Sequence, residues 1–215
     1  MKKFRILIAC EESQAVLKEI IKLNHNDIRV FSCDILPCSG GLENFHLQGD
    51  VIDYLYYNDW DMIIAFPPCT HLAVSGARYF EEKRNNGKQL DGIRFFSFLY
   101  NYPVKYKMIE NPVNIIGGEY IKKYYPRFAY MRTADQYIQP YEYGDGYTKK
   151  TGIWLWNLPH LKPTNIVEGR EQYCWKLPPS KDRAKLRSKT YPGIANAIAT
   201  QLVEYAYNEW KKGVK

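Results

Sequence analysis

Cys69 is the residue of this sequence whose type and setting point most directly to chemistry. It follows a short apolar run at residues 61–66 and two prolines, Pro67 and Pro68. The run predicts a fully buried strand, and the prolines end that strand and stiffen the following turn. A thiol at the carboxyl end of a parallel strand lies where open α/β sheets bind ligands. Such a cysteine is either a nucleophile or a small buried hydrophobic side chain, and position alone leaves both interpretations open.

Three acids, Asp34, Asp50 and Glu110, follow the ends of other predicted strands. Taken singly, each is more typical of a loop cap or a solvated charge. Because the carboxyl ends of parallel strands share one edge of a sheet, the acids and Cys69 together predict a ligand site there. An acid after the second strand commonly binds ribose hydroxyls, and one after the third can contact an adenine amine. This arrangement suits a nucleoside-bearing cofactor.

The predicted elements that must position these residues alternate between strands and helices. Short apolar runs predict strands at residues 4–9, 28–33, 61–66, 106–109, 136–139 and 152–156. Helical spacing of apolar residues predicts helices at residues 13–22, 89–100 and 193–210. Ser13 is the predicted N-cap of the first helix, residues 81–88 are a predicted loop, and the last two strands form a predicted antiparallel pair. The fold class expected is α/β, with a single doubly wound, mainly parallel sheet.

Composition restricts the class of protein further. No apolar run approaches the roughly 20 residues of a membrane span, so we expect a cytoplasmic protein without a membrane partner. The five cysteines form no Cys-x-x-Cys pair, so neither a disulfide framework nor a metal site is expected. Residues 157–215 carry eleven Lys and Arg against five Asp and Glu. This basic third suits phosphate binding, and a solvated surface explains it equally well.

Two of these segments resemble a known family. Residues 67–76, Pro-Pro-Cys-Thr-His-Leu-Ala-Val-Ser-Gly, resemble the Pro-Pro-Cys-Gln-x-x-Ser-x-x-Gly catalytic loop of the cytosine-5 DNA methyltransferases. Residues 109–113, Ile-Glu-Asn-Pro-Val, resemble their Glu-Asn-Val motif. Weaker matches at residues 48–51, 143–151 and 195–198 extend the likeness over about residues 4–205. The whole is most similar to compact methyltransferase-like proteins often carried by phages and prophages.

The resemblance implies a Rossmann-like methyltransferase fold and S-adenosylmethionine-dependent methylation of carbon 5 of cytosine in DNA. Cys69 would add to carbon 6 of the ring, Glu110 would hold nitrogen 3, and Asn111 would brace the loop. Lys149 or Lys150 would bond the base carbonyl where the family uses arginine. The residues expected to contact the cofactor are Ala9, Cys10, Asp34, Asp50, Pro67 and Asn196.

The same resemblance suggests how the chain is divided. Residues 1–156 would form the methyltransferase-like core, 157–190 a reduced basic recognition insert, and 191–215 a helix that completes the core. The basic side chains expected to bind nucleic acid are Lys181, Arg183, Lys185, Arg187 and Lys189. An insert this short is not expected to read a long site through base edges. We therefore expect low sequence selectivity, or help from a protein partner or a homo-oligomer.

Two positions depart from the family pattern. The first loop, residues 8–13, has no glycine where the family has Phe-x-Gly-x-Gly, and Thr70 replaces the glutamine after the cysteine. Carboxylates at Glu11 and Glu12 would repel the cofactor's carboxylate unless they point elsewhere. Two alternatives therefore stand: the same thiol chemistry on RNA or a free pyrimidine nucleotide, or a non-catalytic nucleic-acid or nucleotide binder that retains the fold. The loop favours the binder, whereas Cys69 and Glu110 together favour an enzyme.

Overall fold

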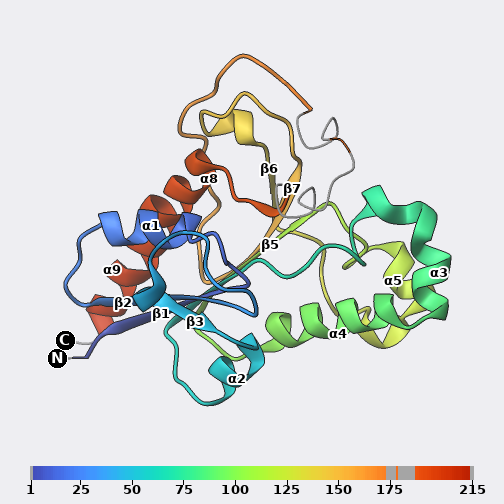
Figure 1. Cartoon of the computed structure of the whole chain (residues 1–215), viewed down its shortest axis with the longest axis horizontal. Helices are drawn as coiled ribbons and strands as arrows, with labels where there is room; N and C mark the ends of the chain where they lie inside the picture. The colour runs from blue at the N-terminus through green and yellow to red at the C-terminus, as the bar shows by residue number, and fades with distance from the viewer. Residues whose placement is uncertain (1, 173–177, 179–186, 214–215) are drawn as a thin grey trace.

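The computed structural model describes residues 2–172, 178 and 187–213 (Figure 1). Within these residues seven strands form one sheet in the order β3-β2-β1-β4-β5-β7-β6. The strands are β1 (Phe4–Ala9), β2 (Ile28–Asp34), β3 (His46–Gln48), β4 (Met62–Ala65), β5 (Tyr106–Pro112), β6 (Gln136–Ile138) and β7 (Thr151–Trp156). Strand β7 runs antiparallel to both of its neighbours, and the other pairs are parallel. The expected doubly wound, mainly parallel sheet is confirmed, and its strand order is that of a Rossmann-like sheet with the antiparallel β7 inserted between β5 and β6.

Helices cover both faces of this sheet. Its α-helices are α1 (Ala15–Lys22), α2 (Val51–Tyr56), α3 (Phe80–Asn85), α4 (Lys88–Asn101), α5 (Glu119–Tyr124), α8 (Pro192–Ala197) and α9 (Glu204–Gly213). The other helical segments are the 3-10 helices η1 (Glu43–Phe45), η2 (Val74–Tyr79), η3 (Pro126–Phe128) and η4 (Pro140–Glu142) and the π-helical η5 (Ile198–Val203). No helix in the described ranges has the length and apolar character needed to cross a membrane.

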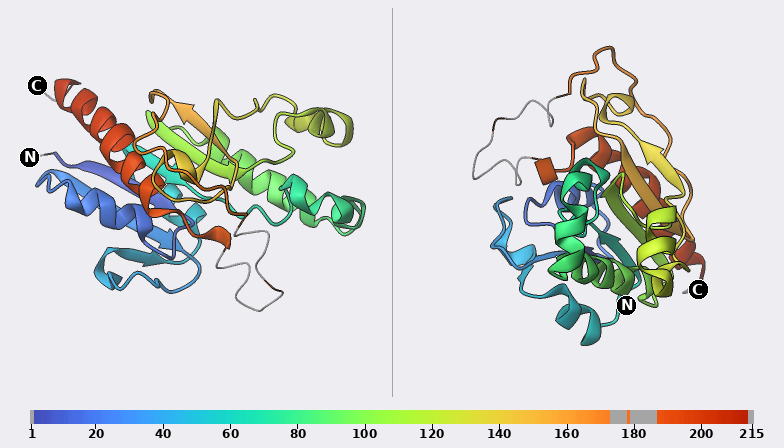
Figure 2. Two further views of the ribbon diagram at one scale, coloured as in Figure 1. Left: turned by 90° about the horizontal axis from the view of Figure 1, so that it is seen from above. Right: turned by 90° about the vertical axis from the view of Figure 1, so that its right-hand side faces the viewer.

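The strand side chains divide into two cores because successive residues of a strand point to opposite faces. Ile6 and Ile8 pack with α1 and the closing helical segment α8–η5–α9, which Figures 1 and 2 show beside α1. Leu7 and Ala9 pack instead with α2, α4 and α5. Burial on both faces explains why the central strands read as continuous apolar runs.

Two local predictions were wrong. Ser13 does not cap α1; the Glu11 carboxylate accepts hydrogen bonds from the Val16 and Leu17 amides at 2.6 and 3.4 Å. Residues 81–88 are not a loop, because α3 occupies most of them and α4 begins at Lys88. Phe80 is buried and anchors α3, while acids in its first turn and bases in its last complement the helix dipole.

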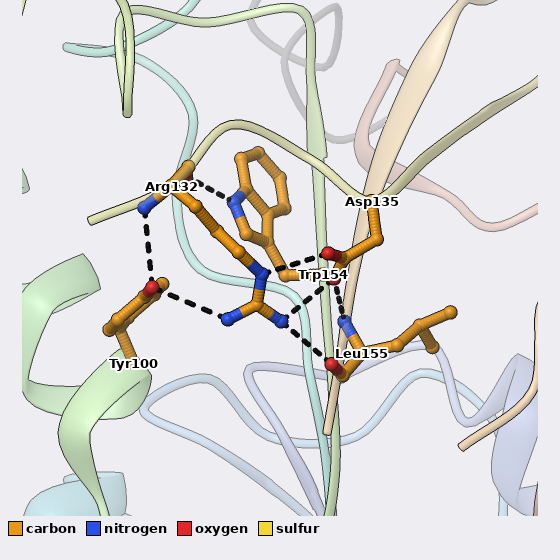
Figure 3. A network of polar contacts seen from close by, with 5 residues as sticks. All are labelled: Tyr100, Arg132, Asp135, Trp154 and Leu155. Atoms are coloured by element: carbon orange, nitrogen blue, oxygen red, sulfur yellow. Dashed lines mark hydrogen bonds and ion pairs between the residues drawn. The ribbon is translucent and has the colours of Figure 1, made fainter. Parts of the chain in front are cut away.

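A polar network fastens β7 to its surroundings (Figure 3). Arg132 donates to both oxygens of Asp135 at 2.8 Å and to the Leu155 carbonyl at 2.7 Å. The Asp135 carboxylate also accepts from the Leu155 amide at 2.7 Å, and the Trp154 indole donates to the Arg132 carbonyl at 2.9 Å. The Arg132 guanidinium also reaches the Tyr100 hydroxyl on α4 at 3.3 Å. These bonds hold β7 in place, and β7 is the strand whose preceding residues lie beside the carboxyl end of β5.

Candidate active site

The loops that follow β4 and β5 are joined by several hydrogen bonds. The buried Asn111 side chain donates to the Pro67 carbonyl at 2.8 Å and accepts from the Asn114 amide group at 2.8 Å. Backbone bonds link Val74 to Val113 and Ile115 to Leu72 at 3.0 and 3.2 Å. The strand order reverses between β1 and β4, so the loop after β4 borders the topological switch point, where ligands bind in such sheets, and the loop after β5 lies next to it.

Cys69 sits in a tight turn of the loop after β4. Its carbonyl accepts from the Leu72 and Ala73 amides at 3.0 and 2.9 Å, and the fully buried Leu72 anchors the turn. The cysteine itself is half-buried. Gly92 lets α4 approach this turn, because a β-carbon there would lie 3.3 Å from the His71 side chain. The turn is therefore held by the packing of Leu72 and by its close contact with α4.

Charged side chains surround the Cys69 thiol. Burial raises its pKa, the Glu110 carboxylate raises it further, and the cations Lys149 and Arg187 oppose the increase. Burial also raises the pKa of Glu110, against the charge of Lys149 and a hydrogen bond from Thr151. The structure thus brings three of the predicted catalytic residues, Cys69, Glu110 and Lys149, into one electrostatic neighbourhood. Asn111 completes the set through its bond to the Pro67 carbonyl.

The antiparallel strand β7 positions Lys149 in this site. Gly152 pairs with Asn111 and Thr151 with Pro112, so the residues just before β7 pass the end of β5. The Lys149 amide donates to the Gln139 side chain at 2.9 Å. Lys150 lies over the Tyr137 ring of β6, 4.8 Å from the ring centre. Of the two lysines considered from the sequence, Lys149 is therefore the one beside Cys69 and Glu110.

Arg187 was predicted to bind nucleic-acid phosphates, and the structure places its charge close enough to Cys69 to lower the thiol pKa. The following segment is held against residues 143–147. Tyr191 packs on Tyr147 with ring centres 5.6 Å apart, and the Gly193 amide donates to Asp145 at 3.3 Å. Lys189 is exposed, and Lys181, Arg183 and Lys185 lie outside the described residues.

The loop after β1 forms the turn expected of a glycine-rich segment without containing glycine. Cys10 and Gln14 have φ angles of 62° and 56°, in the left-handed region that favours glycine. The Glu11 carboxylate is buried against the first turn of α1, where its pKa rises to about 8 because burial outweighs the amide bonds it accepts. The Glu11 carboxylate is therefore occupied by the backbone of α1.

The predicted cofactor acids gather beside that loop. Burial raises the pKa of Cys10, and Asp34 and Asp50 raise it further, which places both carboxylates near the end of β1. Asp34 accepts from the Leu36 amide and Asp50 from the Ile52 amide, each at 2.9 Å. Each carboxylate is thus oriented by backbone amides and retains capacity to accept further hydrogen bonds.

The remaining predicted cofactor residues are placed differently. Pro67 is buried and offers its carbonyl to Asn111, and Ala9 is buried and offers its carbonyl to the Phe66 amide at 2.9 Å. Asn196 is exposed on α8 and donates to Glu19 on α1 at 3.0 Å. Its side chain joins α1 and α8, and its role in cofactor binding stays a prediction.

Sequence reasoning missed Gln89, a fully buried glutamine on α4. Its amide donates to the His71 carbonyl at 3.3 Å, two residues after Cys69. Its carbonyl oxygen accepts from the hydroxyls of Tyr120 and Tyr125 at 2.9 and 3.1 Å. Gln89 therefore connects the cysteine turn to α5. A polar residue beside Leu90 and Ile93 in the apolar stripe of α4 was the available signal.

Comparisons with known proteins add little to these observations. No protein-family model matches the chain, and no curated protein matches it. Among solved structures, the chain is similar to the crystal structure of S. pombe Dnmt2 methyltransferase, with 14% sequence identity and a TM-score of 0.44. The match covers 74% of this chain and 51% of that one, so this chain spans about half the length of that protein.

Proposed function

We propose that this protein transfers a methyl group from S-adenosylmethionine to carbon 5 of cytosine in DNA through a covalent adduct with Cys69. The observation that carries the proposal is the grouping of Cys69, Glu110 and Lys149 on loops that Asn111 ties together. A thiol nucleophile, a carboxyl group that readily holds a proton and a nearby cation are what this reaction requires.

Each residue has a separate role in the proposed chemistry. Carbon 5 of cytosine is a weak nucleophile until a group adds to carbon 6. The Cys69 thiolate, favoured by Lys149 and Arg187, forms the sulfur–carbon 6 bond, and the ring electron pair moves toward nitrogen 3. Glu110 supplies a proton at nitrogen 3, and its raised pKa makes that donation easier. Lys149 bonds the base carbonyl. Carbon 5, made nucleophilic by this addition, would then form its bond to the methyl group that the cofactor supplies. Loss of the carbon 5 proton to water expels the Cys69 thiolate, and the nitrogen 3 proton returns to Glu110, which restores the aromatic ring.

The residues at the β1–β2–β3 edge fit the proposed cofactor. Asp34 and Asp50 can accept hydrogen bonds from ribose hydroxyls and an adenine amine, and their charges suit a cationic sulfonium and ammonium. Ile35, 72% exposed beside Asp34, offers an apolar contact for a purine ring. Glu11 does not oppose the cofactor's carboxylate, because it is engaged with α1. When bound, the cofactor supplies the methyl group, and in a duplex the target base must first leave the stack.

The test combines transfer with trapping. Purified protein given DNA and labelled S-adenosylmethionine should label cytosine, and DNA carrying 5-fluorocytosine should remain covalently bound to the Cys69 peptide. RNA and free cytidine nucleotides in parallel reactions separate the substrate classes. The proposal fails if none of the substrates is labelled and calorimetry detects no binding of S-adenosylmethionine. Labelling of RNA or nucleotide alone would keep the chemistry and replace the substrate.

A further inference from the structure

Helices α3 and α5 lie side by side at the end of the molecule opposite the termini (Figures 1 and 2). Arg84 of α3 joins them: it donates to the Tyr120 hydroxyl, and its guanidinium lies 4.3 Å from the centre of the Tyr124 ring. Beneath this contact, the rings of Phe80 and Tyr120 pack 5.0 Å apart. The two helices therefore form one continuous surface.

This surface is basic. Residues 74–88 and 119–127 contain seven cations and three acids. The cations are Arg78, Lys83, Arg84, Lys88, Lys122, Lys123 and Arg127, and the acids are Glu81, Glu82 and Glu119. Arg78, Lys122 and Lys123 are exposed, although Lys122 also pairs with Glu119 at 2.7 Å. The excess of four positive charges is more than half of the chain's formal net charge of +7.

The basic surface continues into the cysteine turn. Lys83 of α3 donates to the carbonyl of Thr70, the residue after Cys69, at 2.6 Å. The pKa of His71 is lowered by burial and by the charges of Lys83 and Lys88, so these cations lie close to the same turn. A chain of positive charge therefore runs from the candidate active site across α3 to α5.

We propose that the basic surface of α3 and α5 binds the sugar–phosphate backbone of the DNA strand whose target base lies at Cys69. Phosphates are the anions that a strand leaving the site would present at regular spacing to Lys83, Arg78 and α5. Backbone contact is favoured over base stacking, because cations already cover the exposed rings of Tyr79 and Tyr124. The identity of the strand rests on the proposed function, whereas the binding surface does not depend on methyl transfer.

The experiment compares two triple variants of equal charge. Arg78→Gln/Lys122→Gln/Lys123→Gln removes cations from the proposed surface. The control, Lys3→Gln/Lys22→Gln/Arg29→Gln, removes the same charge elsewhere and matches the local contacts at two of the three positions. Lys22 is paired with Glu19 as Lys122 is with Glu119, and Arg29 covers Phe31 as Arg78 covers Tyr79.

Fluorescence anisotropy with single-stranded and duplex DNA is measured from 50 to 300 mM salt, after thermal unfolding shows that both variants are folded. The surface variant should bind at least about tenfold more weakly at low salt. The slope of log affinity against log salt should fall by about 2, at roughly 0.7 per lost phosphate contact on single-stranded DNA. Equal loss in both variants, or none in either, overturns the proposal. Because binding is read without transfer, an inactive enzyme with surface-dependent binding would reject only the proposed function.

Discussion

Two carboxylates of this protein, Asp135 and Glu110, each lie beside a cation, yet their pKa values move in opposite directions. Burial alone would raise the pKa of Asp135, but the hydrogen bonds from Arg132 and the Leu155 amide lower it overall. Burial raises the pKa of Glu110, and Lys149 and Thr151 do not reverse the increase. The Arg132 guanidinium binds both oxygens of Asp135 at 2.8 Å, which is why the carboxylate form of Asp135 is stabilised.

The difference separates a structural pair from a reactive one. Asp135 is saturated by protein donors, so its charge is stabilised and its role is to hold β7 in place. Glu110 is less fully compensated, so its carboxyl group retains a proton more readily and can give it to a ligand. The comparison therefore predicts that loss of Glu110 affects activity, whereas loss of Asp135 affects stability.

The largest expected effect is on turnover. Glu110→Gln should lower methyl transfer by about 100-fold to 10,000-fold, because the proton donor is lost while the fold remains. Asp135→Asn, the matched variant, should instead lower the free energy of unfolding by about 2 kcal/mol with near-normal turnover of the folded fraction. Single-turnover assays and urea unfolding measure the two effects. If both variants lose activity and stability in parallel, the distinction between the sites is wrong.

A smaller loss is expected when the link between the two loops is cut. Asn111→Ala removes the donor to the Pro67 carbonyl and should cost about 1–2 kcal/mol of stability, since a buried acceptor is left unpaired. The Asn111–Pro67 bond fixes the position of the Cys69 turn relative to Glu110. Without it the two catalytic groups are less well aligned, so transfer should fall by about ten- to 100-fold. Crystallographic or hydrogen-exchange data would show the loosened loop. Full activity in a destabilised Asn111→Ala protein would show that the bond serves the fold alone.

The charges around Cys69 should alter its reactivity several-fold, without any cofactor or DNA. Glu110→Gln removes a charge that raises the thiol pKa, so alkylation should reach half its maximal rate at lower pH. Lys149→Gln removes a charge that lowers this pKa, so the profile should move to higher pH. Lys150→Gln, which removes a lysine over Tyr137, is the control and should not move it. The pH profile of each of the three variants is measured by iodoacetamide labelling of the Cys69 peptide between pH 7 and 10, quantified by mass spectrometry. Shifts of the same sign in the first two variants would contradict the geometry.

Much of this organisation could be predicted from the sequence, because buried parallel strands leave apolar runs and strand ends gather at one edge. Cys69 and Glu110 were predicted in this way, whereas Lys149 or Lys150 was predicted from the resemblance of the motifs. Short helices such as α2 and α5 were missed, since six residues give too few turns to show a period. The partners of Gln89 are tertiary contacts, so the sequence could signal only a polar residue in an apolar stripe. The Glu11 cap was missed because its carboxylate reaches the α1 amides across a left-handed turn at Gln14, which the sequence does not announce with a glycine.

The smallest effect, and the most direct test of the comparison, is the pH dependence of stability. Asp135 has a lowered pKa in the folded state, so its contribution is complete above the unfolded value near 3.8 and is lost as the pH falls below it. Glu110 has a raised pKa, so the folded protein keeps a proton that the unfolded chain releases above about pH 4.5. Stability therefore falls as the pH rises from that value through the raised pKa of the folded state.

Relative to the wild type, Asp135→Asn should therefore flatten the acid limb of the stability curve, and Glu110→Gln should flatten the decline at higher pH. Urea unfolding at half-unit intervals from pH 3 to 8 resolves the two limbs. If Glu110→Gln leaves the upper limb unchanged, Glu110 does not retain its proton in the fold, and the donor role at nitrogen 3 loses its physical basis.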